Sequence, residues 1–348
     1  MARLAGVDVS TVSRVVNSHP ALRIADATRE RVEAAINELG YRPNVQARGL
    51  RLARNWTIGF VLPDLMNPFY APIVEGAEQR ASESGYMVVI VRELDRAARD
   101  HELGFERLVH QQRVDGLLVA SGRVDDSVLR ALAAEDHPLV IVNRRVPGVA
   151  GYVIVDDEAG TYLATRHLLE LGHRRLGHVA GPSGIDNTER RSAGFEAAAR
   201  ESGAQTNVVH GHGWDPESGY VAAHQLLERW APTAVLATNI VVAAGVVGAA
   251  QERGLRVPDD LSVMALHDFP AAQFMRPSIS TVVLPLEHLG RLAMDVLLER
   301  LAGAPPREVV VDTEPQLVLR GSTAPPLHSR KHERRTTRPG PAPASGSG

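Results

Sequence analysis

The chain has 348 residues, of which 44% are hydrophobic, and this length allows two or three domains with large cores. It has no cysteine, which excludes disulfides, thiolate metal sites and cysteine nucleophiles and leads us to expect a cytoplasmic protein. No positively charged start is followed by an apolar run, and the most apolar stretch, 234–250, is interrupted by Thr238 and Asn239, so we expect neither a signal peptide nor a membrane span.

The net charge of -3 is distributed unevenly along the chain. Residues 1–55 hold nine arginines and five acidic residues, a net charge of +4, and residues 325–348 also carry +4. The remaining residues, 56–324, carry -11. A small basic module joined to an acidic body is typical of a protein that binds nucleic acid, because basic side chains neutralise phosphates and release counterions.

The first predicted element of note is a helix over residues 9–17, with Asp8 as its N-cap and Val9 as its first helical residue. Val12, Val15 and Val16 share one face of this helix, and Ser10, Ser13, Arg14 and Asn17 share the opposite face. One side is therefore suited to packing and the other to hydrogen bonding.

Another helical pattern follows, in which Val32, Ala35, Ile36 and Leu39 share a face and the helix ends at Gly40. The first 43 residues thus predict three short helices. Residues 44–55, "NVQARGLRLARN", are arginine-rich and only weakly amphipathic, which indicates a linker.

These segments resemble a known family. "ARLAGVDVSTVSRVVN", "TRERVEAAINELGYRPN" and "ARGL" resemble the DNA-binding headpiece and hinge of the lactose-repressor family of bacterial transcription regulators. The resemblance continues to about residue 322, through "LLELGHRRLGHVAGP", "RRSAGF" and "GLRVPDDLSV". It implies a helix-turn-helix DNA-binding domain (1–43), a hinge helix (44–56) and a core that binds an effector and dimerises (57–324). The remaining residues, 325–348, are rich in proline, serine, glycine and arginine without an apolar period, so we expect a disordered tail.

The resemblance also implies which residues contact DNA. Val9, Ser10 and Arg14 match base-reading positions of the recognition helix. Thr11, Ser13 and Asn17 match phosphate contacts, and Leu50 matches a hinge leucine that is inserted into the minor groove. Asn44, Ala47 and Arg48 lie beside it in the hinge.

Four positions in the DNA-binding segments depart from the family pattern. Met1 stands in the place of a valine, so that the first helix lacks its opening turn. This pattern indicates a misassigned start codon, and we expect a protein that truly begins at Met1 to bind DNA more weakly. Asp8 and Ala25 replace serines that begin helices, although we expect Asp26 to cap the third helix instead of Ala25. Gly49 lowers the helix propensity of the hinge by about 0.5–1 kcal/mol.

From Trp56 onward, short apolar runs alternate with helical patterns, which predicts βαβ units and an α/β fold with parallel sheets. The runs are "TIGFVLP", "YMVVIV", "VDGLLVA", "PLVIVN", "LGHVAG", "TAVLAT" and "LSVMAL". The resemblance implies a two-lobed core like that of periplasmic binding proteins. Its first lobe spans about 57–155 and 287–312, and its second about 156–284 and 313–324.

Ligands of such sheets bind beyond the carboxyl ends of the strands, so the residues after each apolar run are candidate contacts. Those positions offer planar hydrogen-bonding groups and aromatic rings, which suit the hydroxyls and apolar faces of a sugar. The candidate effector-binding residues are Asn67, Phe69, Tyr70, Asn143, Arg191, Trp214, Asn239, His267 and Asp268. By resemblance, Arg191 matches an effector-contacting arginine and Trp214 a stacking tryptophan. His267 stands where an aspartate is common, and we expect it to make binding pH-dependent.

Enzyme functions find little support. The sequence has no phosphate-binding loop and no dinucleotide fingerprint, and His173 and His178 lack a third metal ligand at a useful spacing. We assign the pair Asp156 and Asp157 to a turn or a lobe crossing. We therefore expect no catalytic residue, cofactor or metal.

The sequence thus predicts a homodimeric repressor that binds double-stranded operator DNA and is released by a small-molecule effector, which we expect to be a sugar; a tetramer stays open. Two alternatives stay open as well. One is a periplasmic solute-binding protein, which would carry an export signal and no recognition helix. The other is a regulator-like protein whose shortened N-terminus impairs DNA binding.

Overall fold

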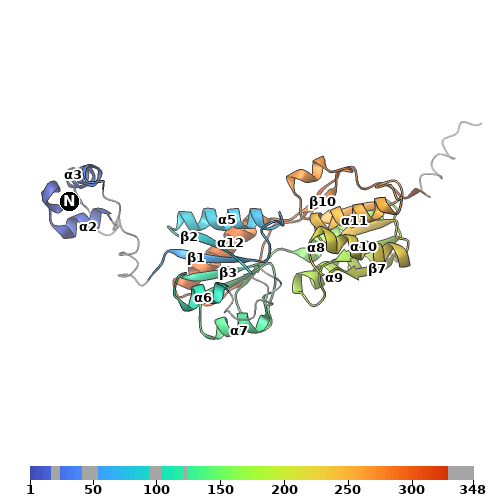
Figure 1. The fold of residues 1–348 in the computed structure, drawn as a ribbon, viewed down its shortest axis with the longest axis horizontal. Coiled ribbons are helices and arrows are strands. Elements are labelled where there is room, and N and C mark those ends of the chain that lie inside the picture. Colours follow the sequence, from blue (N-terminus) through green and yellow to red (C-terminus); the bar gives the residue numbers. More distant parts are fainter. Residues whose placement is uncertain (17–23, 41–53, 94–103, 121, 123, 328–348) are drawn as a thin grey trace, which may run out of the picture. The chain divides into compact units, whose positions relative to one another are not determined.

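The computed structural model describes residues 1–16, 24–40, 54–93, 104–120, 122 and 124–327, and the chain divides into two compact units, 1–56 and 57–348 (Figure 1). Within the described part of the chain, no helix is long and apolar enough to cross a membrane.

The N-terminal unit contains three helices, α1 (Ala2–Ala5), α2 (Val9–Val16) and α3 (Asp26–Glu38). Their shared core consists of Ala5, Val12, Val15, Val32 and Ala35. The predicted apolar faces of α2 and α3 are therefore confirmed for these residues.

The start of α3 differs from our prediction. Asp26 is the first helical residue, and Ala25 occupies the N-cap position, where no side chain makes a capping hydrogen bond. The carboxylate of Asp26 lies in the first turn, where it is favoured by the positive end of the helix dipole and does not cap the helix.

The second unit contains two six-stranded sheets, and we call each sheet with its helices a lobe. The first sheet has the order β11-β5-β4-β3-β1-β2 and is parallel throughout. Its strands are β1 (Thr57–Leu62), β2 (Met87–Arg92), β3 (Gly116–Val119), β4 (Leu139–Val142), β5 (Tyr152–Ile154) and β11 (Glu308–Val310). Helices α5 (Tyr70–Glu83) and α12 (Leu286–Leu301) pack together beside this sheet, and α6 (Gly104–His110) and α7 (Asp126–Ala134) contribute to the core on its other face.

The second sheet has the order β12-β10-β9-β8-β6-β7 and is parallel except for β12, which runs antiparallel to β10. Its strands are β6 (Arg175–Ala180), β7 (Gln205–His210), β8 (Ala234–Ala237), β9 (Ser262–Leu266), β10 (Ser280–Val283) and β12 (Gln316–Val318). Helices α8 (Asp157–Glu170) and α9 (Asp186–Glu201) pack as one pair, and α10 (Pro216–Arg229) and α11 (Ile240–Glu252) as another. A short 3-10 helix, η1 (Pro270–Phe274), follows β9.

The α/β fold with parallel sheets is therefore as predicted, and all seven apolar runs form strands. The parallel arrangement matters for function because it places the carboxyl ends of β1, β3 and β4 at one edge of the first sheet, and those of β6, β8 and β9 at one edge of the second.

Candidate functional site

The outward face of α2 is the candidate DNA-reading surface. Val9 is 75% exposed, and Ser10 and Arg14 are also exposed, whereas Val12 and Val15 on the opposite face are buried. An exposed valine at the first position of a helix gains nothing from packing within its own unit. The helix therefore presents one apolar and two polar side chains to a partner, the mixture that base edges and a thymine methyl group require.

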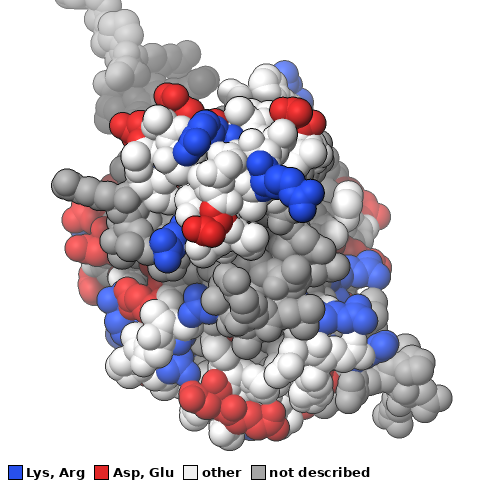
Figure 2. All heavy atoms as spheres, turned by 90° about the vertical axis from the view of Figure 1, so that its left-hand side faces the viewer, with Lys and Arg blue, Asp and Glu red and all other residues white. Residues whose placement is uncertain are grey.

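Other predicted DNA contacts are only partly described. Thr11 and Ser13 are half-buried on α2. Asn17, Asn44, Ala47, Arg48 and Leu50 lie outside the described residues, as does most of the predicted tail. Figure 2 shows basic and acidic side chains interspersed on the face that it presents, so the described charges form no patch of a single sign there.

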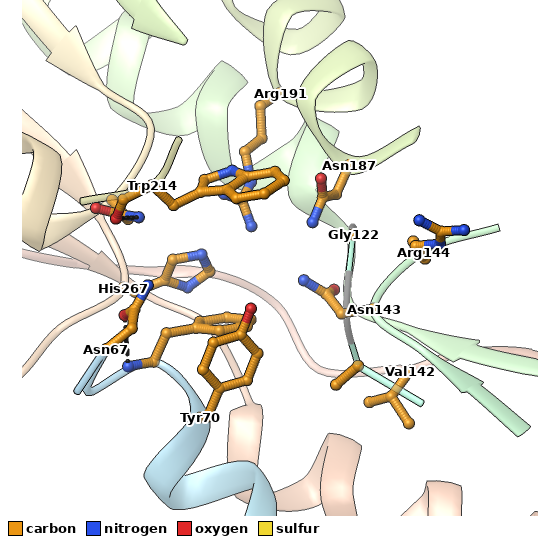
Figure 3. Close-up of a pocket in the computed structure, with 13 residues that line it drawn as sticks. Asn67, Tyr70, Gly122, Val142, Asn143, Arg144, Asn187, Arg191, Trp214 and His267 are labelled. Carbon is orange, nitrogen blue, oxygen red and sulfur yellow. Dashed lines mark hydrogen bonds between the residues drawn. The ribbon is translucent and has the colours of Figure 1, made fainter. Parts of the chain in front are cut away.

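The second unit contains a pocket that residues of both lobes line (Figure 3). The empty volume of this pocket is about 410 Å³, a figure that includes solvent space at its open side. Val142 is the last residue of β4, and every other lining residue lies in a segment that follows the carboxyl end of a strand. The lining residues are Asn67, Phe69, Tyr70, Ala120, Gly122, Val142, Asn143, Arg144, Asn187, Arg191, Trp214, Asn239 and His267.

Among the described residues, four lining side chains carry buried polar atoms without a hydrogen-bond partner: Nε of Arg144, Oδ1 of Asn187 and every polar side-chain atom of Asn143 and His267. Asn143 and His267 are 3% and 2% exposed, and both have positive φ angles, 59° and 65°. Unsatisfied buried groups and left-handed backbone each destabilise the fold, and both tend to occur where a ligand binds.

His267 does not behave as we predicted. Burial, together with the positive charge of Arg191, holds the pKa of His267 well below its usual value of 6.5. The imidazole is therefore neutral at physiological pH and offers one donor and one acceptor. The expectation that it titrates near neutral pH is wrong, because we did not foresee its complete burial.

Arg191 is fixed by groups behind the pocket wall. Its Nε donates to Oδ1 of Asp157 at 2.8 Å, and its Nη1 donates to the carbonyl oxygen and the hydroxyl of Thr238 at 3.2 and 3.3 Å. Asp157 is the first residue of α8 and is fully buried. The neighbouring Asp156 caps α8 by accepting from the Ala159 amide at 2.9 Å. Asp157 therefore positions an arginine, and the pair is part of the structural framework at the start of α8.

The aromatic side chains are positioned by close contacts. The ring centroid of Phe69 lies 4.5 Å from that of His267 and 4.9 Å from that of Tyr70. Trp214 lies against Gly181, where an added Cβ would be 2.5 Å from the indole Nε1. Only glycine allows the indole to lie so close to the end of β6.

Asp268 is the one candidate effector-binding residue that does not line the pocket. Its carboxylate forms a two-point ion pair with Arg320, with distances of 2.7 and 2.9 Å, and also accepts from the Thr281 hydroxyl at 2.7 Å. The structure thus places Asp268 in an ion pair at the edge of the second sheet.

Five lining residues are not among the candidate effector-binding residues, although Arg144 and Asn187 lie in segments that follow predicted strands: Ala120, Gly122, Val142, Arg144 and Asn187. Asn187 had a usable signal, because it lies four residues before Arg191 on the same face of α9. The other four follow or end β3 and β4, which the rule about carboxyl ends already indicated.

The predicted histidine pair is structural. His173 contacts the Thr233 hydroxyl at 2.9 Å and the Ala324 carbonyl at 3.0 Å, and His178 contacts the Leu236 carbonyl at 2.9 Å. Burial lowers the pKa of His178 to about 4. Among the described residues, no group of three or more His, Cys, Asp or Glu side chains is arranged to hold a metal ion.

Comparisons with known proteins match this architecture. Residues 1–44 match the family described as "Bacterial regulatory proteins, lacI family", and residues 165–323 match a periplasmic binding protein-like domain. The "HTH-type transcriptional regulator DegA" of Bacillus subtilis (strain 168) is 34% identical over 335 residues, which are 93% of this chain and 97% of DegA.

Solved structures agree with the sequence matches. The lac repressor dimer bound to operator and the anti-inducer ONPF superimposes with a TM-score of 0.76 at 30% identity, over 93% of this chain and 97% of that one. The complex of the transcriptional regulator CelR with cellobiose gives a TM-score of 0.70 at 32% identity, over 92% and 98% of the two chains. The chain therefore belongs to the lacI family of bacterial regulatory proteins and is a DNA-binding transcriptional regulator.

Proposed function

We propose that this regulator is a repressor whose pocket in the second unit binds a sugar, and that the sugar releases the protein from its operator. The observation that carries the proposal is the pair of buried, unpartnered polar side chains, Asn143 and His267. A sugar hydroxyl is both donor and acceptor, so a ring of hydroxyls can satisfy an amide and a neutral imidazole together. Satisfying such buried groups removes a desolvation cost of about 1–3 kcal/mol each.

The remaining lining side chains fit the same ligand. Phe69 and Trp214 supply aromatic surface for the apolar faces of a sugar ring, and Asn67 and Asn239 supply further amides. The CelR structure, which is 32% identical to this chain, contains cellobiose. The relative therefore supports a carbohydrate as the effector class.

For DNA, we propose that α2 enters the major groove. Val9, Ser10 and Arg14 read base edges, and Thr11, Ser13 and Asn17 contact phosphates. We further propose that Asn44, Ala47 and Arg48 lie beside Leu50 in the hinge and that Leu50 enters the minor groove. The lac repressor structure is a dimer bound to operator, which supports a homodimer on a near-palindromic site.

The two sites are coupled through the difference in sugar affinity between the DNA-bound and free states. A sugar can weaken operator binding only by the factor by which the operator weakens sugar binding. A ligand that binds both states equally therefore releases nothing, however tight its binding.

A screen in two steps tests the proposal. First, thermal denaturation of the full chain against a library of sugars identifies ligands that raise the melting temperature. Second, duplexes selected from a random pool at low salt are titrated with and without each such sugar. We expect a selected duplex whose affinity falls when the sugar is added. Sugars that bind but leave duplex affinity unchanged would contradict the release mechanism, and a chain that binds no duplex would favour the alternative of impaired DNA binding.

A further inference from the structure

Arg190 directly precedes the pocket arginine, Arg191, on α9, yet it does not line the pocket. Successive residues of a helix point about 100° apart, so the two side chains leave α9 in different directions. The side chain of Arg190 is only 10% exposed. Burying a charge is costly unless the charge is paired, so the partners of this arginine should show what it does.

The guanidinium of Arg190 contacts segments of both lobes. Its Nε lies 3.0 Å from Oδ2 of Asp186, one turn earlier on α9, and its Nη1 lies 2.8 Å from Oδ2 of Asp157 at the start of α8. Nη1 also donates to the carbonyl oxygen of Val155, at a crossing between the lobes, at 2.9 Å. Nη2 donates to the carbonyl oxygen of Asn143, in the first lobe, at 3.5 Å. The planar fork of one arginine thus bridges groups that a lysine, with a single nitrogen, would not reach together.

Asp186 adds a second contact with the first lobe. The Oδ2 atom that pairs with Arg190 also accepts from the backbone amide of Arg145 at 3.0 Å. Arg190 and Asp186 therefore hold the two successive peptide groups on either side of Arg144. We call these two side chains of α9 the lobe clamp.

The segment that the lobe clamp holds also lines the pocket. Asn143 and Arg144 line it from the first lobe, whereas Asn187 and Arg191 line it from α9, the helix that carries the lobe clamp. Figure 3 shows Asn143 and Asn187, one from each lobe, on the same side of the pocket. The lobe clamp thus joins, from outside the pocket, two segments whose side chains line it from opposite lobes.

Asn143 needs such support because its conformation is unfavourable. Its φ angle of 59° is left-handed, and its buried side-chain amide makes no hydrogen bond among the described residues. Such features persist only where surrounding contacts hold them in place. The lobe clamp supplies contacts of this kind from protein groups alone.

We infer that Arg190 is a positioning residue that, together with Asp186, holds the two lobes in the arrangement that forms the pocket. This inference rests on the proposed function in so far as the pocket is the effector site. The apparent dissociation constant of a ligand rises as the fraction of protein in the binding arrangement falls. The lobe clamp therefore sets the affinity for the effector without touching it.

The first experiment measures the lobe arrangement without a ligand. The chain has no cysteine, so Ala131→Cys on α7 and Gln225→Cys on α10 place one spin label on each lobe at exposed positions. Labelled chain is diluted with unlabelled chain, so that double electron–electron resonance reports the distance within one chain. We expect Arg190→Lys to give a distance distribution about twofold broader than the parent, because lysine keeps the charge but bridges fewer groups.

Arg300→Lys is the matched control. The Arg300 side chain is 14% exposed, and its guanidinium contacts Asp136 and the Ala304 carbonyl oxygen, at 2.8 and 2.9 Å, within the first lobe. Both lysine variants should lose stability in urea denaturation, but only Arg190→Lys should broaden the distribution. Equal distributions in Arg190→Lys and the parent, or equal broadening in Arg300→Lys, would overturn the inference.

The second experiment leaves Arg190 in place and compares two substitutions of Asp186. Asp186→Asn retains an oxygen that can accept from the Arg145 amide, whereas Asp186→Ala does not. The readout is acrylamide quenching in a Trp56→Phe/Trp230→Phe chain, where Trp214 in the pocket is the only indole. We expect Asp186→Ala to raise the quenching constant about twofold, because looser lobes expose the indole, and Asp186→Asn to stay near the parent. Equal quenching in all three chains would overturn the inference.

Neither readout requires an effector, so the inference and the proposed function can fail separately. If no sugar binds while Arg190→Lys and Asp186→Ala loosen the lobes, the sugar function fails and the lobe clamp stands. If a sugar releases the operator while these variants keep the parent's distances and quenching, the lobe clamp fails and the proposed function stands.

Discussion

The side-chain amide of Asn239 joins the start of helix α11 to the backbone of Trp214. Its Oδ1 accepts from the Val242 amide at 2.7 Å and so caps the helix, and its Nδ2 donates to the Trp214 carbonyl oxygen at 3.2 Å. One residue thus stabilises a helix and fixes the loop that carries an aromatic wall of the pocket.

Substitutions of Asn239 can separate these two roles. Asn239→Ala loses both hydrogen bonds, and we expect the free energy of unfolding to fall by about 0.5–2 kcal/mol with the loss of the N-cap. Asn239→Ser keeps an oxygen that can cap α11 but loses the donor to Trp214. We expect it to retain most of the stability and to bind sugar more weakly. Urea denaturation and titration of Trp214 fluorescence measure the two effects, and a serine variant with unchanged sugar affinity would contradict the role of the Trp214 contact.

Much of the fold could be predicted because its central strands are apolar. All seven apolar runs form strands. Six of them are buried along most of their length, as strands covered on both faces of a sheet must be, whereas β2 is an edge strand with exposed and half-buried side chains. Strand β7 was missed because it is an edge strand, with the polar sequence "QTNVVH" and exposed or half-buried side chains. Strands β5, β11 and β12 have three residues each, which is too short for a periodic pattern, and only their pairing with neighbours defines them.

The candidate site could be predicted to a similar extent and for a similar reason. Strand ends locate the pocket, because parallel strands bring their carboxyl ends to one edge. The partners of each side chain could not be predicted, because they come from distant parts of the sequence. The ion pair of Asp268 could not be foreseen, since its partner, Arg320, lies 52 residues further along the chain. The buried position of His267 likewise depends on contacts between lobes that no local pattern encodes.

Arg14→Ala tests the recognition helix. Arg14 is exposed on the outward face of α2, so its removal should leave the folded unit intact. We expect operator binding to weaken by about 1–3 kcal/mol and discrimination to be lost at one base position. Competition between the selected duplex and its single-base variants measures this discrimination. A uniform loss of affinity across all duplexes would instead indicate that Arg14 contacts a phosphate and reads no base. We expect this uniform loss for the control variant, Thr11→Val.

The two buried neutral histidines predict how stability depends on pH. The folded pKa of His178 is about 4 and that of His267 is well below 6.5, whereas both are near 6.5 when unfolded. Below pH 6.5 the unfolded chain binds protons that the folded chain does not, so each histidine lowers the free energy of unfolding by about 1.4 kcal/mol per pH unit. For His178 this loss ends near pH 4.

Replacing His267 isolates one of these contributions. Asn tolerates the positive φ at this position, so His267→Asn removes a titrating group with little backbone strain. We expect urea denaturation between pH 6.5 and 4 to show a shallower loss of stability in the variant than in the parent. Between pH 6.5 and 8 the parent's sugar affinity should be constant, and a twofold or larger change there would indicate that His267 does titrate.

Helices α5 and α12 lie so close together that a single methyl group added between them should lower the stability of the fold. A Cβ added at Gly76 would lie 2.0 Å from the carbonyl oxygen of Glu287, and one added at Gly290 would lie 1.9 Å from that of Ile73. Gly76→Ala must therefore separate the two helices, and we expect it to lower the free energy of unfolding by about 1–3 kcal/mol or more. Gly248→Ala in α11 is the control. A Cβ there meets only a Tyr220 ring carbon at 3.7 Å, so helix propensity should raise stability by about 0.5–1 kcal/mol. Equal effects of the two substitutions in urea denaturation would contradict the close helix contact.

Trp214→Ala separates effector response from DNA binding. The indole lines the pocket in the second unit, whereas the predicted DNA contacts lie within residues 1–56. The substitution therefore removes aromatic surface from the proposed sugar site and leaves helix α2 unchanged. We expect duplex affinity without sugar to stay within twofold of the parent, and the sugar-induced loss of that affinity to disappear. Trp230→Ala is the matched control, because Trp230 packs against the core of the second lobe away from the pocket lining. It should lower stability and keep the response. Duplex titrations with and without sugar measure both variants, and a Trp214→Ala protein that still releases DNA at the parent's sugar concentration would remove this residue from the effector site.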